Sequence, residues 1–171
     1  LLKSSMPVNE DELTISYNNN HLFVKHGTTQ LSCRLIDARF PDYKVVIPTD
    51  NPYKLTVNKN DFQSALRRVS IFSNKSTNQV VLNISGSELQ LAAQDVDFSF
   101  EGNERMKCQY NGEDLQIAFN AKFLIEMLNG ADSDEIVTEL STPTKAGIIK
   151  PIEQDENEEV LMLVMPLMLN S

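Results

Sequence analysis

The chain contains 171 residues, 41% of them hydrophobic, and carries a formal net charge of −9 at pH 7. The apolar fraction is sufficient for a buried core, and because no apolar run reaches the roughly 18 residues that a membrane span needs, we expect no membrane contact. The acidic balance argues against a protein that holds nucleic acid with its whole surface, although it leaves room for one basic face on an acidic body.

One unit, a helix followed by three strands, recurs along the chain, as in internal-repeat proteins with a period of about 50 residues. The first copy is cut short: residues 1–3 resemble the end of a helix, and alternating apolar residues predict strands over 12–18, 21–26 and 29–36. Because the chain starts at Leu1 without a Met, we expect a piece of a longer protein.

The two cysteines, Cys33 and Cys108, make no disulfide framework. Cys33 alternates with Leu31 and Leu35, so we expect it to be a buried strand thiol. Such a thiol fits a reducing, cytoplasmic location.

Residues 37–52 interrupt the repeat. Pro41 and Pro48 bracket a segment that is unusually apolar for a linker, with Phe40, Val45 and Val46 among its side chains. We predict an extended connector that lies on a surface, and the alternative is an ordinary edge strand. The domain boundary then divides the chain into residues 1–48, the end of one domain with its connector, and 49–171, a complete domain.

The complete domain holds two copies of a unit with an additional strand in front of the helix. The predicted elements are strand 53–57, helix 59–72 and strands 79–85, 88–93 and 97–106, then strand 115–119, helix 121–129 and strands 135–140, 146–150 and 159–165. In the first helix Phe62, Leu66 and Val69 form one apolar stripe. Short connections favour antiparallel pairing, so the predicted class is α+β, with two sheets and two helices on one side.

Basic and amide side chains collect on one face of the first helix, opposite its apolar stripe. Lys59, Gln63 and Arg67 follow one another at intervals of four, and Arg68 lies beside them. A face of this kind either is ordinarily solvated or faces DNA phosphates, and phosphate contacts position a duplex without reading its bases.

The end of the chain is the longest apolar stretch. Residues 160–165 are apolar on both faces, which predicts a strand covered on both sides, and Pro166 ends its ladder. The apolar residues that follow, Leu167, Met168 and Leu169, either pack back on the domain or form the wall of a pocket, for which adaptable Met side chains are suited.

The sequence contains no catalytic or metal-binding motif that we recognise. His21 and His26 lie on one predicted hairpin without partners at metal-ligand spacing. We therefore expect neither an enzyme nor a bound cofactor or metal.

Two separate stretches resemble the bacterial DNA polymerase III beta subunit, the DNA sliding clamp. They are Arg39-Phe40-Pro41-Asp42-Tyr43 with Val46-Ile47-Pro48, and the ending Val164-Met165-Pro166-Leu167-Met168-Leu169. Leu35-Ile36-Asp37 and Asn120-Ala121-Lys122-Phe123-Leu124 also resemble the family. The resemblance implies the DNA clamp fold, in which helices line the hole of a ring and antiparallel sheets form its rim. It also implies a non-catalytic processivity factor that encircles duplex DNA and closes as a head-to-tail homodimer. This chain would supply the end of the second of three domains and the whole third domain.

The resemblance further implies three sets of site residues. A hydrophobic pocket for short linear motifs of the polymerase, the clamp loader and repair proteins would be formed by Pro41, Val45, Val46, Leu163, Met165, Pro166, Leu167, Met168 and Leu169. The DNA-facing residues would be Lys59, Gln63, Arg67 and Arg68. The subunit interface would contain Ile71, Phe72, Asp97, Glu101 and Glu104.

Many clamps carry a basic residue where Val45 and Met168 stand, so the pocket should be more apolar here. We expect the chain by itself not to close a ring, since a first domain would be missing. The rival interpretation is a peptide-binding adaptor without a DNA role, and the absence of a catalytic motif argues against a hydrolase or transferase.

Overall fold

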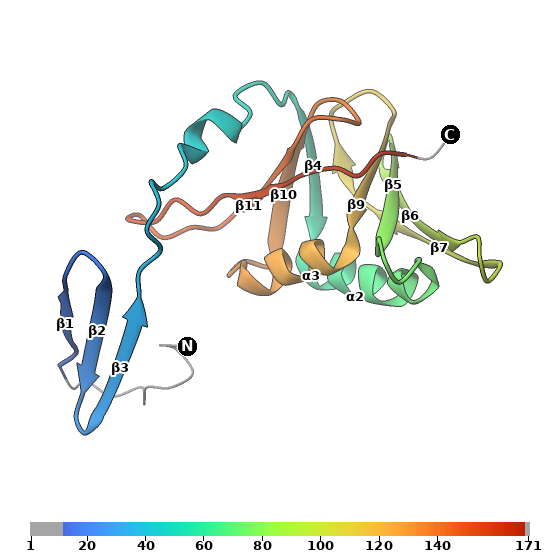
Figure 1. The fold of residues 1–171 in the computed structure, drawn as a ribbon. Coiled ribbons are helices and arrows are strands. Elements are labelled where there is room, and N and C mark those ends of the chain that lie inside the picture. The colour runs from blue at the N-terminus through green and yellow to red at the C-terminus, as the bar shows by residue number, and fades with distance from the viewer. Residues whose placement is uncertain (1–11, 170–171) are drawn as a thin grey trace. The chain divides into compact units, whose positions relative to one another are not determined.

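The computed structural model describes residues 12–169, which form two compact units that divide between Asp42 and Tyr43 (Figure 1). The helix end predicted at residues 1–3 lies outside this range. No helix within residues 12–169 is long and apolar enough to cross a membrane.

The first unit is an antiparallel three-stranded sheet of β1 (Thr14–Tyr17), β2 (His21–His26) and β3 (Thr29–Arg34). The middle strand has its predicted bounds, whereas β1 and β3 are shorter than predicted. Gly27, with a φ of 56°, makes the turn between β2 and β3. Cys33 is half-buried rather than buried, because β3 is an outer strand of this sheet.

The second unit contains both complete copies of the repeat. Its elements are η1 (Tyr43–Val46), β4 (Tyr53–Asn58), α2 (Lys59–Val69), η2 (Ser70–Phe72), β5 (Gln79–Ser85), β6 (Glu88–Asp95), β7 (Phe100–Lys107), β8 (Gln109–Tyr110), β9 (Leu115–Asn120), α3 (Ala121–Gly130), β10 (Glu135–Leu140), β11 (Gly147–Pro151) and β12 (Met162–Val164). The predicted helices and most predicted strands are present, and the predicted α+β class with a duplicated unit is confirmed.

Each copy of the repeat places its first strand in the sheet of the other copy. β4 precedes α2 in the chain but pairs with β10, and β9 precedes α3 but pairs with β5. The result is a five-stranded sheet in the order β12-β11-β10-β4-β8 and a four-stranded sheet in the order β7-β6-β5-β9. All of these pairings are antiparallel.

The two helices begin in the same way and lie side by side (Figure 1). The side chain of Asn58 accepts a hydrogen bond from the backbone N–H of Asp61 at 3.1 Å, and that of Asn120 accepts one from the N–H of Lys122 at 2.9 Å. Asparagine is a favoured N-cap because it satisfies amides that the helix itself leaves unpaired.

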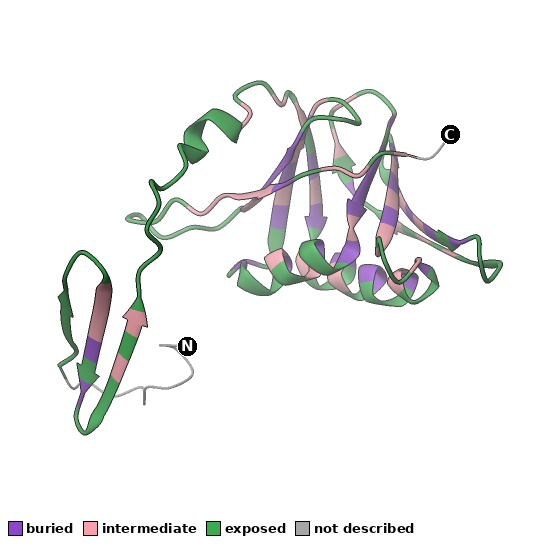
Figure 2. Ribbon diagram, viewed as in Figure 1, coloured by how far each residue is buried: buried purple, intermediate pink, exposed green. Residues whose placement is uncertain are grey.

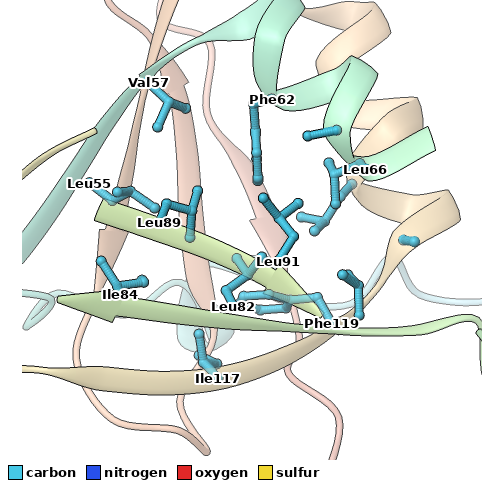
Figure 3. Packing of buried hydrophobic residues seen from close by; sticks show 14 of the residues in the cluster. Leu55, Val57, Phe62, Leu66, Leu82, Ile84, Leu89, Leu91, Ile117 and Phe119 are labelled. Atoms are coloured by element: carbon cyan, nitrogen blue, oxygen red, sulfur yellow. The ribbon is translucent and has the colours of Figure 1, made fainter. Parts of the chain in front are cut away.

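One hydrophobic core joins the helices to both sheets. The predicted stripe of α2, Phe62, Leu66 and Val69, is buried and packs with inward side chains of the strands, including Leu91 and Phe119 (Figures 2 and 3). In the strands, buried and more exposed residues alternate, as the sequence pattern predicts.

Three expectations about the elements were wrong in part. The connector over 37–52 is not extended throughout, because residues Tyr43–Val46 form a 3-10 turn. The strand predicted over 159–165 is only Met162–Val164, and of its residues only Val164 is buried, because β12 is an edge strand that lacks a neighbour on one side. The short strand β8 was not predicted.

The strand predicted over 97–106 begins later, at Phe100. The side chain of Asp95 accepts a hydrogen bond from the N–H of Asp97 at 3.2 Å, and Ser99 adopts a φ of 53°. Residues 96–99 therefore form the turn from β6 into β7, and Asp97 lies in this turn rather than on the edge strand.

Candidate functional site

The C-terminal tail, which we define as residues 162–169, connects the open edges of the two sheets. Val164 of β12 lies opposite Gly147 of β11, at the edge of the five-stranded sheet. Beyond Pro166, the N–H of Leu167 donates a hydrogen bond of 2.8 Å to the carbonyl of Ala118 on β9, the edge of the four-stranded sheet (Figure 1). The tail is therefore fixed at two points on either side of the proline.

The apolar side chains of the tail divide into two groups. Met165 and Met168 are 63% and 79% exposed. The others predicted for the pocket are half-buried: Leu163, Pro166, Leu167 and Leu169. Exposed methionines on a backbone that is held in place form an apolar surface that is open to a partner.

An aromatic side chain beside the tail was missed by the sequence interpretation. Phe123 lies on the predicted helix 121–129 but was assigned to no site, and it is 57% exposed. It borders a hollow of about 190 Å³ that Met127 and Met162 also line. The signal was available in its spacing, because Leu124 and Leu128 already define the buried side of the helix.

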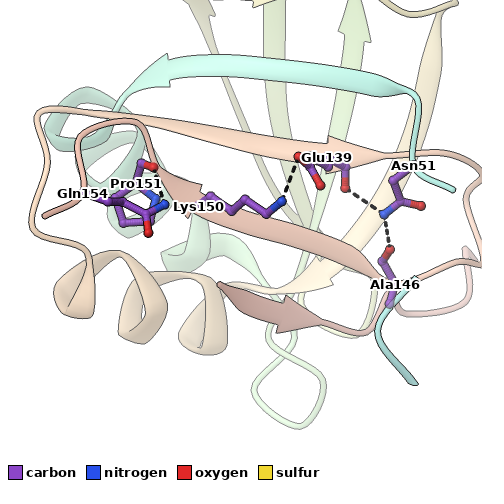
Figure 4. A network of polar contacts seen from close by, with 6 residues as sticks. All are labelled: Asn51, Glu139, Ala146, Lys150, Pro151 and Gln154. Carbon is purple, nitrogen blue, oxygen red and sulfur yellow. Dashed lines mark hydrogen bonds and ion pairs between the residues drawn. The ribbon is translucent and has the colours of Figure 1, made fainter. Parts of the chain in front are cut away.

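The connector side of the predicted pocket is exposed. Val45 and Val46 are exposed on η1, and Pro41 is exposed in the first unit. The end of the connector is anchored by Asn51, whose amide donates hydrogen bonds to the carbonyls of Glu139 at 3.1 Å and Ala146 at 2.9 Å (Figure 4). A pocket wall built jointly from connector and tail stays a prediction.

The β10–β11 hairpin thus holds the end of the connector as well as β12. An ion pair of 3.1 Å between Lys150 and Glu139 joins its two strands, and Gln154 donates a hydrogen bond to the carbonyl of Pro151 just beyond (Figure 4). Two segments with exposed apolar residues, the connector and the tail, are therefore attached to this hairpin.

The predicted DNA-facing residues of α2 have different environments. Lys59 donates to the carbonyl of Ala131 at 2.9 Å, and Gln63 donates to the side chain of Asn129 at 2.8 Å, so both hold α2 to the end of α3. Arg67 is exposed, and its side chain makes no hydrogen bond or ion pair within the described residues.

Arg68 is paired with a residue predicted for the subunit interface. Its Nε donates to Glu104 of β7 at 2.9 Å, and its Nη2 contacts the second carboxylate oxygen. This hydrogen bond lowers the pKa of Glu104, against the opposing effect of burial, and raises the pKa of Arg68. Much of the positive charge of Arg68 is therefore compensated within the protein.

The strand β7 is an outer edge of the four-stranded sheet, next to η2. On η2, Ile71 is 65% exposed, and Phe72 packs so closely on β7 that a Cβ added to Gly102 would lie 2.3 Å from its ring. Glu104 faces α2, whereas Glu101 lies on the opposite face. Phe98 and Phe100, which the sequence analysis assigned to no site, are exposed and stacked with ring centres 6.1 Å apart.

A catalytic or metal centre is not visible in the part of the chain that the structure describes. No group of three or more His, Cys, Asp or Glu side chains in residues 12–169 is arranged to hold a metal ion. The arrangement can instead offer an apolar tail, a helix face and a free sheet edge to partners.

Comparison with known proteins identifies relatives over nearly the whole chain. Residues 44–167 match the family described as "DNA polymerase III beta subunit, C-terminal domain". The beta sliding clamp of Haemophilus influenzae is 27% identical over 92% of this chain and 43% of the relative, and that of Chlamydia muridarum is 30% identical over 92% of this chain and 41% of the relative.

The structural comparison agrees. The DnaN sliding clamp of Bartonella birtlesii, solved bound to griselimycin, is 33% identical with a TM-score of 0.83, covering 92% of this chain and 41% of that one. The chain therefore spans less than half the length of the relatives that it matches.

Proposed function

Because the chain belongs to the DNA polymerase III beta subunit family, the sliding clamps, we propose that it forms part of a ring-shaped processivity factor. The ring encircles duplex DNA in the cytoplasm and holds the polymerase, the clamp loader and repair proteins through their short linear motifs. The chain has no catalytic role of its own. The observation that carries this proposal is the tail, which is fixed at β11 and β9 and leaves Met165 and Met168 exposed.

The tail suits a peptide whose affinity comes from a few apolar side chains. Exposed thioethers adapt to different anchors, and Phe123 with Met162 adds a small apolar hollow on the side of α3. The predicted connector residues Pro41, Val45 and Val46 would complete the pocket.

Removing the end of the tail is expected to abolish most peptide binding. A chain that lacks residues 166–171 should bind a labelled peptide of the type Gln-Leu-x-Leu-Phe at least about tenfold more weakly than the intact chain, because the truncation removes four of the predicted pocket residues. A tenfold change in affinity corresponds to about 1.4 kcal/mol of binding free energy. Fluorescence polarisation measures the change. The variant Met168→Ser, which keeps the backbone bond of Leu167, should show a smaller loss in the same direction.

The matched control is Ile71→Ser, which removes an exposed apolar side chain on η2, next to β7. Peptide affinity should be unchanged in this variant. Equal affinities of the intact chain and both tail variants would overturn the pocket assignment.

The binding of DNA along α2 is expected to depend on Arg67 more than on Arg68. Arg67→Glu should weaken duplex binding. It should also reduce the magnitude of the slope of log K against log salt concentration by about 1–2, since a protein with fewer phosphate contacts releases fewer counterions on binding. Arg68→Glu should have a smaller effect, because Glu104 already compensates Arg68. Lys145→Glu, which changes an exposed residue in the turn between β10 and β11, is the control.

The assay uses duplex DNA at several salt concentrations with the subunit assembled as a ring. The alternative function, a peptide-binding adaptor without a DNA role, is favoured by one observation: Lys59, Gln63 and Arg68 all have partners within the protein. In that case all three charge reversals would leave DNA association unchanged.

We further propose that the free edge β7 takes part in the head-to-tail contact of the homodimer. Ile71 and Phe72 would supply its apolar part, and Glu101 and Glu104 its charge, with Asp97 near its end. Since an unpaired edge strand presents free backbone groups, pairing with another subunit would satisfy them.

A further inference from the structure

A polar hollow lies next to the tail, on the outer face of the four-stranded sheet. Its volume is about 520 Å³, and its lining includes Gln79, Gln94, Gln116 and Asp97. It lies outside the apolar surface to which the peptide function is assigned. The hollow and that surface share one side chain.

That shared side chain is Leu169, which lines the hollow. Leu167 pairs with Ala118 of β9, and β9 pairs with β5, so the tail runs beside this sheet as it leaves Met168. A peptide that lies along the tail therefore meets the hollow as soon as it passes Leu169.

The groups that line the hollow have unused hydrogen-bonding capacity. The side chains of Gln79 and Gln94 make no hydrogen bond within the described residues, whereas the Nε2 of Gln116 donates to the Oδ1 of Asn83 at 2.7 Å and so leaves its carbonyl oxygen available. Primary amides can donate and accept, which suits a peptide backbone or a polar side chain.

The charge in the hollow has one sign. Among the described lining residues Asp97 is the only ionisable side chain, and it is exposed. Its carboxylate can accept a hydrogen bond from an ammonium or guanidinium group. The ligand that fits is a polar segment with a basic residue, not a second apolar anchor.

We propose that this hollow holds the basic, polar residues that flank the apolar anchors of a peptide bound along the tail. The inference rests on the proposed peptide function and adds a preference that the apolar tail cannot supply. It assigns Asp97 to peptide selection in addition to its position near the edge strand.

The test compares five labelled peptides on the 171-residue chain: Gln-Leu-Ser-Leu-Phe alone, and the same peptide extended at its N-terminus or at its C-terminus by two lysines or by two glutamates. At one end, the lysine extension should bind about two- to fivefold more tightly than the glutamate extension, the size typical of an exposed ion pair. Asp97→Asn and Gln94→Ala should each reduce this preference.

Since the whole protein is acidic, a general attraction for lysine must be separated from a local one. Asp132→Asn makes the same charge change at an exposed position away from the hollow, and it should leave the preference intact. In addition, the side-chain amide NMR signals of Gln79 and Gln94 should move with the lysine-extended peptide and not with the short one.

The outcomes separate the two proposals. If all peptides bind equally through the tail, or if Asp132→Asn acts like Asp97→Asn, the inference about the hollow is wrong and the peptide function stands. If no peptide binds, or if binding persists without residues 166–171, both proposals are wrong.

Discussion

Replacing Phe119 with alanine is expected to lower the free energy of unfolding of the chain by about 3–5 kcal/mol, as for large-to-small changes in other cores. The side chain of Phe119 is 0% exposed and belongs to β9 of the four-stranded sheet. Its ring reaches the other sheet, because a Cβ added to Gly147 of β11 would lie 3.5 Å from its Cζ. The variant would open a cavity where the two sheets meet (Figure 3).

Urea unfolding followed by far-ultraviolet circular dichroism measures this loss, since the chain contains no Trp to serve as a fluorescent probe. The control is Phe123→Ala, four residues further along, where the ring is 57% exposed. This change should alter the free energy of unfolding by no more than about 0.5 kcal/mol. Similar losses in the two variants would contradict the packing described here.

Replacing Gly102 with valine is expected to disturb the free edge and to prevent the head-to-tail contact. The new Cβ would lie 2.3 Å from Cδ2 of Phe72, so the ring and η2 must move, and overpacking of this kind costs about 1–3 kcal/mol. Analytical ultracentrifugation of the full-length subunit should show dissociation into monomers, and urea unfolding should show the loss of stability.

Gly130→Ala is the matched control, since a Cβ at Gly130 meets no atom within 4 Å. It should leave both the assembly and the midpoint of unfolding unchanged. A Gly102→Val protein that assembles normally would exclude β7 and Phe72 from the interface.

The secondary structure of this domain was largely predictable because it is encoded locally. In β5, Val80, Leu82 and Ile84 alternate with less buried residues, and the bounds Gln79–Ser85 were predicted without error. Even Asn58 and Asn120, each placed before a helix, carry a local N-cap signal that the interpretation did not use.

The pairing of strands was not predictable, because alternation tells which face is buried but not which strand lies alongside. Nothing local to Leu55 indicates that its partner is Thr138, although both are buried. The turn at 96–99 was missed for a related reason. Phe98 and Phe100 have high strand propensity, and only the contact of Asp95 with the N–H of Asp97 shows where the strand is interrupted.

The residues of the candidate site could be predicted from the sequence only where no structural role accounted for them. Met168 was suspected because apolar residues near a chain end need a reason, and its exposure agrees with that reasoning. Met165 was expected to be covered as part of a strand that is apolar on both faces, and only the family resemblance assigned it to the pocket, yet it is 63% exposed. The partner of Arg68 was hidden, because Glu104 lies 36 positions away in the chain. The helix spacing alone made Arg67 and Arg68 look equivalent.

The exchange of first strands between the two halves of residues 43–171 has a consequence for how this domain is made. β4 is synthesised early, but its sheet partner β10 emerges 77 to 87 residues later, since Asn58 pairs with Glu135 and Tyr53 pairs with Leu140. The first half therefore has an incomplete sheet of its own during synthesis. The distant pairing of β4 with β10 costs loop-closure entropy, which is offset only when the contacts of the complete sheet form. The domain resembles a strand-swapped dimer fused into one polypeptide, and such an arrangement favours a single all-or-none folding transition over independent folding of the halves.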